Sequence, residues 1–290
     1  VKRAIDIVEL IGQSVQLKRT GHNYLGLCPF HQEKDPSFTV SPSKQMFHCY
    51  GCRKGGDVFA FWMEYHKVSF PEALRDLAER YHVPLPKGSL AAEDKEKWSE
   101  RASLLKVNEI ACEHYHRLLT ESAKGKPGRT YLEGRGITQE VLSSFRLGYA
   151  PDEWDSLCKV ITKGDLGKAQ DTRLVIPKKN GGFYDRFRAR IIFPIFDLRG
   201  RILGFGGRVL GDSSPKYLNT PESPLFHKGR VLYGLHASYE AIRKSGRAVI
   251  VEGYMDLLAL RRHGFQEVVA TLGTAMTREH VRLLKGYARE

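Results

Sequence analysis

The 290-residue sequence predicts a mixed α+β and α/β fold with three parts: a metal-bound ribbon, a basic α+β segment and an alternating strand–helix end. Three observations predict it. Two Cys-containing pairs flank short strands near the N-terminus, and Lys and Arg gather around strand-like segments after residue 173. Residues 248–286 then alternate strand, helix, strand and helix, which is typical of a parallel sheet covered by helices.

The composition favours a folded protein with an anionic partner. Lys and Arg number 46 against 33 Asp and Glu, so the net charge of +13 predicts an anionic partner, nucleic acid before an anionic membrane surface. Hydrophobic residues at 41% are enough for a core, which excludes disorder of the whole chain. No apolar run approaches the roughly 18–20 residues that cross a bilayer. Five cysteines without an apolar leader predict reduced thiols in the cytoplasm.

The first predicted domain covers residues 1–86. Apolar spacing predicts a first helix, on Ile5, Val8, Leu10 and Ile11. Short strands follow at 23–27, 37–40 and 45–48, and helices at 57–65 and 70–81. Asp57 and Ser69 are expected to cap these two helices. Pro84 and Pro86, followed by a Gly-Ser pair and a charge run, predict a linker at 87–97.

A metal site is predicted within this domain by the pattern C-x2-H-x17-C-x2-C, formed by Cys28, His31, Cys49 and Cys52. Three thiolates and one imidazole suit one tetrahedral Zn²⁺, and four protein ligands leave no open position, so the zinc is expected to be structural. The alternative is a set of buried thiols without metal. His48 is a competing ligand, but as the strand neighbour of Cys49 it should face the opposite way.

The second predicted domain covers residues 98–247. Helical spacing extends over 98–120 and 139–145, and strands are expected at 174–176, 190–193 and 201–205. The third part, 248–290, is expected to hold strands at 248–251 and 267–270 and helices at 254–262 and 277–286.

A basic region runs from residue 173 to 230, with twelve Lys or Arg against four Asp or Glu. The period-two spacing of Arg186, Arg188 and Arg190 predicts one shared strand face. Further candidate phosphate ligands are Arg199, Arg201, Arg208, Lys216 and Lys228. Glycines at 204–207 are expected to let backbone amides approach a phosphate. Interleaved aromatic residues favour single-stranded nucleic acid over the alternative, a solvated basic face.

A carboxylate ends the strand at 248–251. Ligands of open α/β sheets bind at the carboxyl ends of parallel strands, which makes Glu252 a candidate site residue. Asp256 lies one helical turn further on and could share a Mg²⁺ with it. The alternative is a salt-bridged structural carboxylate.

Taken together, four segments resemble the bacterial DNA primase family. They are YLGLCPFHQEKDPSFTVSPSKQMFHCYGC, YDRFRARIIFPIFDLRGRILGFGGRVL, SPKYLNTPESPLFHKGRVLYGL and VIVEGYMDLLAL. The resemblance implies a CHC2-type zinc ribbon that contacts single-stranded template, then the N-terminal part of an RNA polymerase domain. It also implies that residues 248–290 open a TOPRIM sheet, so that the final strand–helix–strand–helix is its first βαβα.

The resemblance implies a nucleotidyltransferase that makes RNA primers on single-stranded DNA. Arg135, Arg208, Lys216 and Lys228 would bind nucleotide or template, and Glu252 would be the first acid of a Mg²⁺ or Mn²⁺ site and the general base. The implied partners are ribonucleoside triphosphates, the template and a replicative helicase that binds a C-terminal domain absent from this chain. A cytoplasmic monomer without membrane contact is expected.

The sequence departs from the family pattern at one point. An Asp-x-Asp motif, which carries the catalytic metal in the family, does not follow the strand at 267–270. We therefore expect these residues alone to be weakly active or inactive, with DNA binding retained. Two alternatives stay open: a non-catalytic, zinc-dependent single-stranded DNA-binding module, and a TOPRIM topoisomerase or nuclease, which would need a nucleophilic tyrosine or further acidic clusters.

Overall fold

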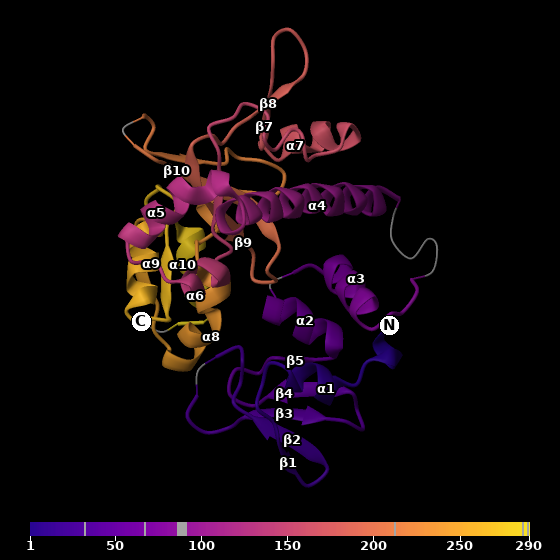
Figure 1. Ribbon diagram of the computed structural model, residues 1–290. Coiled ribbons are helices and arrows are strands. Elements are labelled where there is room, and N and C mark those ends of the chain that lie inside the picture. The colour runs from indigo at the N-terminus through magenta and orange to yellow at the C-terminus, as the bar shows by residue number, and fades with distance from the viewer. Residues whose placement is uncertain (32, 67, 86–91, 212, 286, 289) are drawn as a thin grey trace. The chain divides into compact units, whose positions relative to one another are not determined.

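The computed structural model describes residues 1–31, 33–66, 68–85, 92–211, 213–285, 287–288 and 290. The chain divides into two compact units, unit 1 (residues 1–95) and unit 2 (residues 96–290) (Figure 1). The mixed α+β class is confirmed: unit 1 holds an antiparallel ribbon with flanking helices, and unit 2 an antiparallel sheet followed by a parallel strand pair.

Unit 1 is built on a five-stranded antiparallel sheet in the order β1-β2-β3-β4-β5. The three predicted strands are confirmed as β2, β3 and β4, whereas β1 and β5 were not predicted. The strands are β1 (Lys18–Thr20), β2 (Asn23–Gly26), β3 (Phe38–Ser41), β4 (Met46–Cys49) and β5 (Gly55–Gly56). The helices are η1 (Lys2–Ala4), α1 (Ile7–Gly12), α2 (Val58–His66) and α3 (Phe70–Arg80).

Local capping chemistry explains where the helices of unit 1 begin. The Asp57 carboxylate accepts the amides of Phe59 and Ala60 at 3.0 and 3.1 Å, and Glu72 accepts the Ser69 amide at 2.9 Å. Both predicted caps are therefore confirmed. An aromatic core joins helix α2 to the sheet, with ring centroids 5.2–6.3 Å apart among Phe30, Phe38, Phe47 and Phe61.

The predicted linker differs from the structure over part of its length. Residues 87–91 lie outside the described residues, and residues 92–97 form the first turns of the long helix α4 (Ala92–Thr120). The stretch AEDKEK is rich in strong helix formers, and its propensity favours helix without an apolar face.

Unit 2 contains a four-stranded antiparallel sheet in the order β11-β10-β9-β6. Its strands are β6 (Gly148–Ala150), β9 (Arg190–Phe196), β10 (Ile202–Val209) and β11 (Tyr217–Asn219). A separate hairpin pairs β7 (Val175–Pro177) with β8 (Phe183–Asp185). The remaining helices of this part are η2 (Ala123–Gly125), α5 (Lys126–Gly134), α6 (Gln139–Ser144), η3 (Lys163–Asp165), α7 (Leu166–Asp171) and η4 (Lys228–Arg230).

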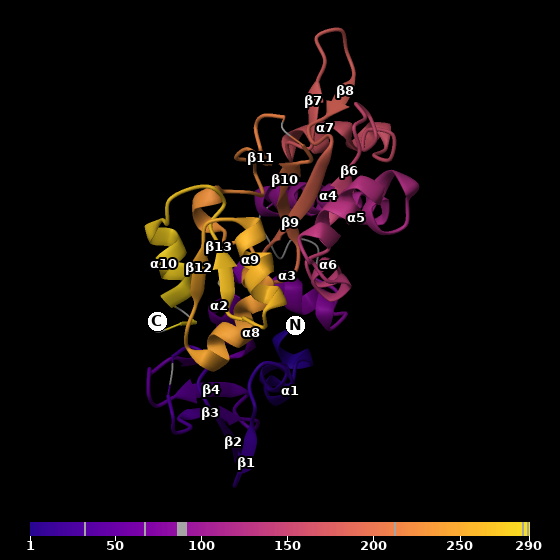
Figure 2. The same ribbon diagram turned by 60° about the vertical axis from the view of Figure 1, so that its left-hand side comes forward.

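The C-terminal part confirms the predicted strand–helix–strand–helix order. It runs from β12 (Val249–Val251) through α9 (Tyr254–Arg262) and β13 (Val268–Ala270) to α10 (Arg278–Lys285), after helix α8 (Leu235–Ser245). Strands β12 and β13 are parallel, with Val249 opposite Val268 (Figure 2).

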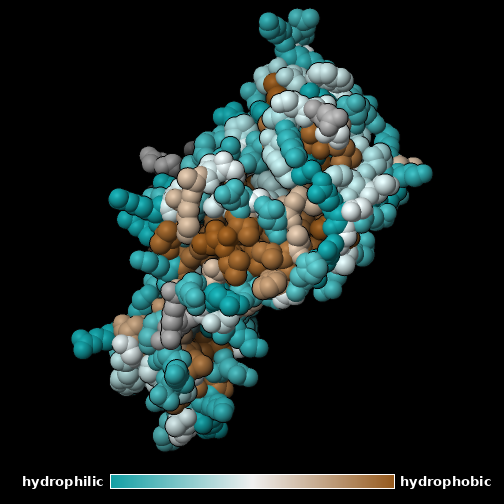
Figure 3. All heavy atoms as spheres, turned by 90° about the vertical axis from the view of Figure 1, so that its left-hand side faces the viewer, coloured by the Kyte–Doolittle hydropathy of each residue, from teal (hydrophilic) through white to brown (hydrophobic). Residues whose placement is uncertain are grey.

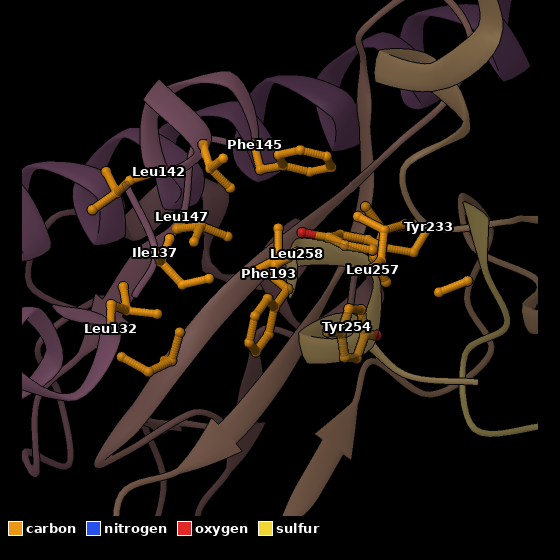
Figure 4. Packing of buried hydrophobic residues seen from close by; sticks show 14 of the residues in the cluster. Leu132, Ile137, Leu142, Phe145, Leu147, Phe193, Tyr233, Tyr254, Leu257 and Leu258 are labelled. Carbon is orange, nitrogen blue, oxygen red and sulfur yellow. The ribbon is translucent and has the colours of Figure 1, made fainter. Parts of the chain in front are cut away.

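One hydrophobic core joins the C-terminal part to the rest of unit 2. Figure 4 shows Phe145 and Phe193 packed with Tyr233 and Tyr254, so the cluster draws on both sides of residue 247. The predicted domains 98–247 and 248–290 therefore share their packing. The described residues contain no helix long and apolar enough to span a bilayer.

An apolar patch lies on the face of unit 2 that Figure 3 turns to the viewer. Large exposed apolar side chains of the last 45 residues are Ile250, Phe265, Met276 and Val281. Within the described residues β12 pairs with β13 alone, so it is the edge of this two-stranded sheet.

Candidate metal centre and nucleic-acid interface

The four predicted zinc ligands of unit 1 come together. Cys28 follows β2, and Cys49 ends β4, so the two pairs meet beside the ribbon. The ligand atoms of Cys28, His31, Cys49 and Cys52 all lie within 4.8 Å of one another. Over the described ranges, this is the one group of three or more Cys, His, Asp or Glu close enough to share a metal.

The spacing of these atoms fits a tetrahedral Zn²⁺. Bond lengths of about 2.3 Å to sulfur and about 2.0 Å to nitrogen place tetrahedral neighbours about 3.8 Å apart for two sulfurs and about 3.5 Å apart for sulfur and nitrogen. The Cys28 and Cys52 sulfurs are 3.8 Å apart, and the Cys49 sulfur lies 3.6 Å from His31 Nδ1. The residues present therefore fit zinc, with His31 binding through Nδ1.

Glu33 supports the site from outside the ligand set, and the sequence prediction missed it. Its Oε2 lies 3.2 Å from His31 Nε2, while its Oε1 accepts the Cys28 amide at 2.7 Å and the Ser37 amide at 3.0 Å. Burial alone would raise the pKa of the Glu33 carboxyl, but the hydrogen bonds from Ser37 and Cys28 hold it below its ordinary value. Such outer partners orient metal-bound imidazoles.

Gly51 makes room for the imidazole. A Cβ atom at this position would lie 2.4 Å from His31 Nε2, closer than real contacts allow. A glycine is required at this position because the imidazole approaches the backbone closely. His48 is exposed on β4 while Cys49 is buried, which confirms that it faces away from the metal ligands.

The predicted shared face of three arginines is wrong. Strand β8 ends at Asp185 and β9 begins at Arg190, so Arg186 and Arg188 lie in the connection between them. Ala189 has a left-handed backbone with φ +47°, which breaks the extended alternation. Arg186 and Arg188 are half-buried, whereas Arg190 is buried and donates to the carbonyl of Pro215 at 2.9 Å.

An exposed stack forms around Arg188. Its guanidinium lies 4.0 Å from the ring centroid of Trp154 and 5.5 Å from that of Tyr184. Trp154 is 61% exposed, and the sequence prediction did not single it out. A large exposed indole beside a cation is the arrangement on which unpaired bases stack.

Several other predicted residues have partners inside the protein. Arg201 pairs with Asp197 at 2.7 Å, and the Arg199 amide donates to the same carboxylate at 2.9 Å, which shapes the turn between β9 and β10. Arg186 Nε donates to the carbonyl of Arg173 at 2.5 Å. These contacts give each residue a structural role next to its predicted phosphate-binding role.

Arg135 and Arg208 come together around Tyr131. Their guanidinium carbons lie 5.4 and 5.2 Å from its ring centroid, so the tyrosine is flanked by two cations. Arg208 is 9% exposed, lies 5.2 Å from the Tyr217 ring centroid and donates to the Tyr217 hydroxyl. Arg135 is exposed at the end of α5. Lys216, which precedes β11, is exposed, and Lys228 is half-buried at the start of η4.

The glycines of β10 pack against side chains, contrary to the expected phosphate nest. A Cβ atom at Gly206 would lie 2.3 Å from the Tyr254 ring and hydroxyl, and one at Gly207 would lie 2.7 Å from Phe187. Strand β10 is buried along its whole length. Its backbone amides are therefore unavailable to a ligand.

Glu252 and Asp256 occupy the predicted position at the carboxyl end of β12. Glu252 follows the strand, and Asp256 lies in the first turn of α9; both side chains are exposed. Tyr254 between them is buried and donates to Asn219 at 2.7 Å, and burial raises its pKa. A buried hydroxyl of this kind does not support the nucleophilic tyrosine that a topoisomerase would need.

Comparison with known proteins finds family models for three segments of the chain. Residues 1–93 match the family model of the CHC2 zinc finger, 114–239 that of the DNA primase catalytic core, N-terminal domain, and 246–290 that of the Toprim domain. The crystal structure of the Aquifex aeolicus primase zinc-binding and RNA polymerase domains superposes with a TM-score of 0.62 at 39% identity, over 99% of this chain and 69% of that one.

The chain belongs to the bacterial DNA primase family. The DNA primase of Halalkalibacterium halodurans is 46% identical over 288 residues, which cover 98% of this chain and 48% of that protein. The DNA primase of Pseudomonas putida is 44% identical over 97% of this chain and 43% of its own length. The chain thus spans about half the length of these primases.

A further primase structure bears on the interface. The structure of the DnaG primase catalytic domain bound to ssDNA matches at 40% identity and a TM-score of 0.63, over 66% of this chain and 62% of that one. The CHC2 match agrees with the Cys/His cluster of unit 1, so zinc is the metal that the primase family and the geometry both indicate.

Proposed function

We propose that this chain forms the template-handling and nucleotide-handling part of a DNA primase, an enzyme that synthesises short RNA primers on single-stranded DNA. The observation that carries the proposal is the 39% identity to a primase zinc-binding and RNA polymerase structure over nearly the whole chain, with the four zinc ligands in place.

Zinc is assigned a structural role in unit 1. Cys28, His31, Cys49 and Cys52 supply four ligands, so no position remains for a substrate. The ion holds the β2–β3 and β4–β5 connections together, which fixes the face that carries the exposed pair His48 and Tyr50, with ring centroids 4.8 Å apart. Exposed aromatic rings on such a ribbon suit the bases of a single strand.

Single-stranded template is assigned to the basic surface of unit 2. Trp154 offers a stacking surface and Arg188 a phosphate or stacking contact beside it. Arg135 adds an exposed cation beside Tyr131. The binding of ssDNA by a related primase catalytic domain supports this assignment.

Ribonucleoside triphosphates are assigned to the region of Glu252. In the proposed reaction the 3′-hydroxyl of one ribonucleotide attacks the α-phosphorus of the next, and pyrophosphate leaves. Arg208, Lys216 and Lys228 offset the negative charge of the triphosphate. Glu252 and Asp256 are two exposed carboxylates one helical turn apart, a donor pair that suits Mg²⁺ or Mn²⁺ with substrate oxygens. When bound, such a metal activates the hydroxyl and stabilises the leaving pyrophosphate.

The test compares Glu252→Gln with a matched control, Glu240→Gln, whose side chain is 73% exposed on α8. Ribonucleotide incorporation on single-stranded DNA is measured with the protein encoded by the complete gene, and DNA affinity with the 290-residue chain. We expect Glu252→Gln to abolish synthesis and leave DNA affinity unchanged, and Glu240→Gln to change neither. Full synthesis by Glu252→Gln would overturn the assignment.

The second candidate is a zinc-dependent single-stranded DNA-binding module without catalysis. It is favoured by one observation: within the described residues, Glu252 and Asp256 belong to no group of three potential metal ligands. Under this alternative, the protein of the complete gene binds DNA and makes no primer even with Mn²⁺. With the primase assignment we also propose that the protein binds a replicative helicase, is a monomer and is located in the cytoplasm.

A further inference from the structure

The beginning of helix α10 is hydrogen-bonded to the turn that starts at Lys228. Thr277 Oγ1 donates to the carbonyl of Gly229 at 2.7 Å, and His280 Nε2 lies 3.0 Å from the carbonyl of Lys228. The two segments are about fifty residues apart in the sequence and lie on opposite sides of residue 247. Neither Thr277 nor His280 has a role in the function proposed above.

The hydrogen bonds fix the tautomer of His280. The Thr277 amide donates to His280 Nδ1 at 3.3 Å, so Nδ1 accepts and Nε2 carries the proton that is donated to Lys228. The His280 amide donates to Thr277 Oγ1 at 3.0 Å, which closes a reciprocal cap with histidine in the place where glutamate usually stands. His280 is fully buried, so water does not compete for these bonds.

The backbone N–H of Lys228 is also hydrogen-bonded. Lys228 N–H donates to Glu222 Oε1 at 2.9 Å, and Arg173 Nε donates to the Glu222 carbonyl at 3.4 Å. The peptide groups on both sides of Lys228 are thus fixed, while its side chain stays half-exposed. A fixed backbone with a free side chain is the arrangement of a lysine aimed at an external anion.

We propose that His280 is a positioning residue for Lys228, which directs the lysine ammonium toward a phosphate of the nucleotide or template. The inference rests on the proposed function, in which Lys228 binds that phosphate. It predicts that the first turn of α10 contributes to anion binding indirectly. This turn does not contact the anion but holds the backbone at Lys228, whose side chain does.

The test separates the two ring nitrogens. His280→Gln places an amide donor near Nε2 and keeps the bond to Lys228, whereas His280→Asn retains only an acceptor near Nδ1 and keeps the helix cap. Each variant is combined with Lys228→Met, and affinity is measured for a fluorescent single-stranded oligonucleotide and for ATP. His236→Ala, which removes an exposed histidine hydrogen-bonded to the Leu198 carbonyl, is the matched control.

We expect His280→Asn to lower the affinity for the probe that Lys228 contacts by about threefold to tenfold, the effect of one hydrogen bond. In the chain that already carries Lys228→Met, His280→Asn should not lower the affinity further. His280→Gln and His236→Ala should bind as the unaltered chain does. Equal weakening by His280→Asn in both backgrounds, or by Asn and Gln alike, would overturn the positioning role. If Lys228→Met changes neither probe, the proposed role of Lys228 fails instead.

Thr277→Val keeps the proposal testable if His280→Asn does not fold. It replaces the hydroxyl by a methyl group and so removes two bonds: the one that Thr277 donates to the Gly229 carbonyl and the one that it accepts from the His280 amide. Its effect on the same probe should again disappear in Lys228→Met, and thermal unfolding of each variant reports any general loss of stability. Persistence of the effect in Lys228→Met would contradict the inference.

Discussion

Replacement of Gly51 by alanine should release the zinc ligand His31. An added Cβ would lie 2.4 Å from His31 Nε2 and 2.7 Å from Cε1, whereas carbon contacts need about 3.5–4.0 Å. The imidazole would have to move by about 1 Å, several times the tolerance of about 0.2 Å in metal–ligand distances. We therefore expect Gly51→Ala to lower the apparent zinc affinity by more than about 100-fold, beyond the usual effect of an outer-shell change.

The assay is competition with a chromophoric chelator in reducing buffer, followed by circular dichroism of the zinc-free protein. Gly12→Ala is the matched control, because nothing lies within 4 Å of a Cβ there and the residue is in helix α1. The control should keep its zinc and become slightly more stable, since alanine favours a helix over glycine. Unchanged zinc affinity in Gly51→Ala would refute Nδ1 ligation of His31 and with it the geometry of the site.

The remaining predictions concern the outer shell, pH and nucleic acid. Glu33→Gln should weaken zinc binding by about 10–100-fold in the same chelator assay, and no change would leave Glu33 outside the metal's influence. Burial lowers the pKa of His114 from its ordinary value of 6.5, so this histidine binds a proton more readily in the unfolded chain than in the folded one. The free energy of unfolding should therefore fall as the pH drops below 6.5. His114→Gln should flatten this dependence in urea titrations; an unchanged slope would contradict it. Trp154→Ala should cost about 1–3 kcal/mol of single-stranded DNA affinity and Trp154→Phe much less, whereas equal losses would argue against stacking. Affinity should fall with salt at a log–log slope of about −0.7 per neutralised phosphate, and a flat profile would count against a basic interface.

Local chemistry explains which features the sequence predicted. The zinc ligands follow from two x2 pairs, because a single tight turn presents both members of each pair. The Asp57 cap and the alternation that turns His48 away from Cys49 depend on neighbours one to three residues apart. The parallel order of β12 and β13 follows from a strand–helix–strand pattern, which has essentially one handedness.

The prediction of one shared face for Arg186, Arg188 and Arg190 failed because their alternate spacing does not belong to one continuous strand. Phe187 is buried in the core of unit 2, so Arg186 and Arg188 do share the outer side of a connection. The positive φ of Ala189 then turns the chain, and Arg190 enters the protein at the start of β9. Nothing in the local pattern reports this turn, because alanine rarely adopts a left-handed backbone.

Long-range contacts account for what the sequence could not predict. Arg135 and Arg208 are more than seventy residues apart and meet only because Tyr131 of α5 lies beside Arg208 of β10. The Glu33 contacts span only four or five residues, but they too depend on the packing that brings the Cys28 turn close to Ser37. Such arrangements follow from packing, whose partners a single sequence does not name.

Tyr254 links the acidic and basic parts of unit 2. It lies between Glu252 and Asp256 in sequence, stacks on Phe193 of β9 at 4.6 Å between ring centroids, and donates to Asn219 of β11. Gly206 leaves the space that its ring fills. Because the ring is buried and contacts two strands of the antiparallel sheet, the carboxylates on either side of it have a fixed register relative to β11 and to Lys216, which precedes that strand. Gly206 therefore contributes by admitting the Tyr254 ring, which ties the segment that carries Glu252 and Asp256 to the antiparallel sheet.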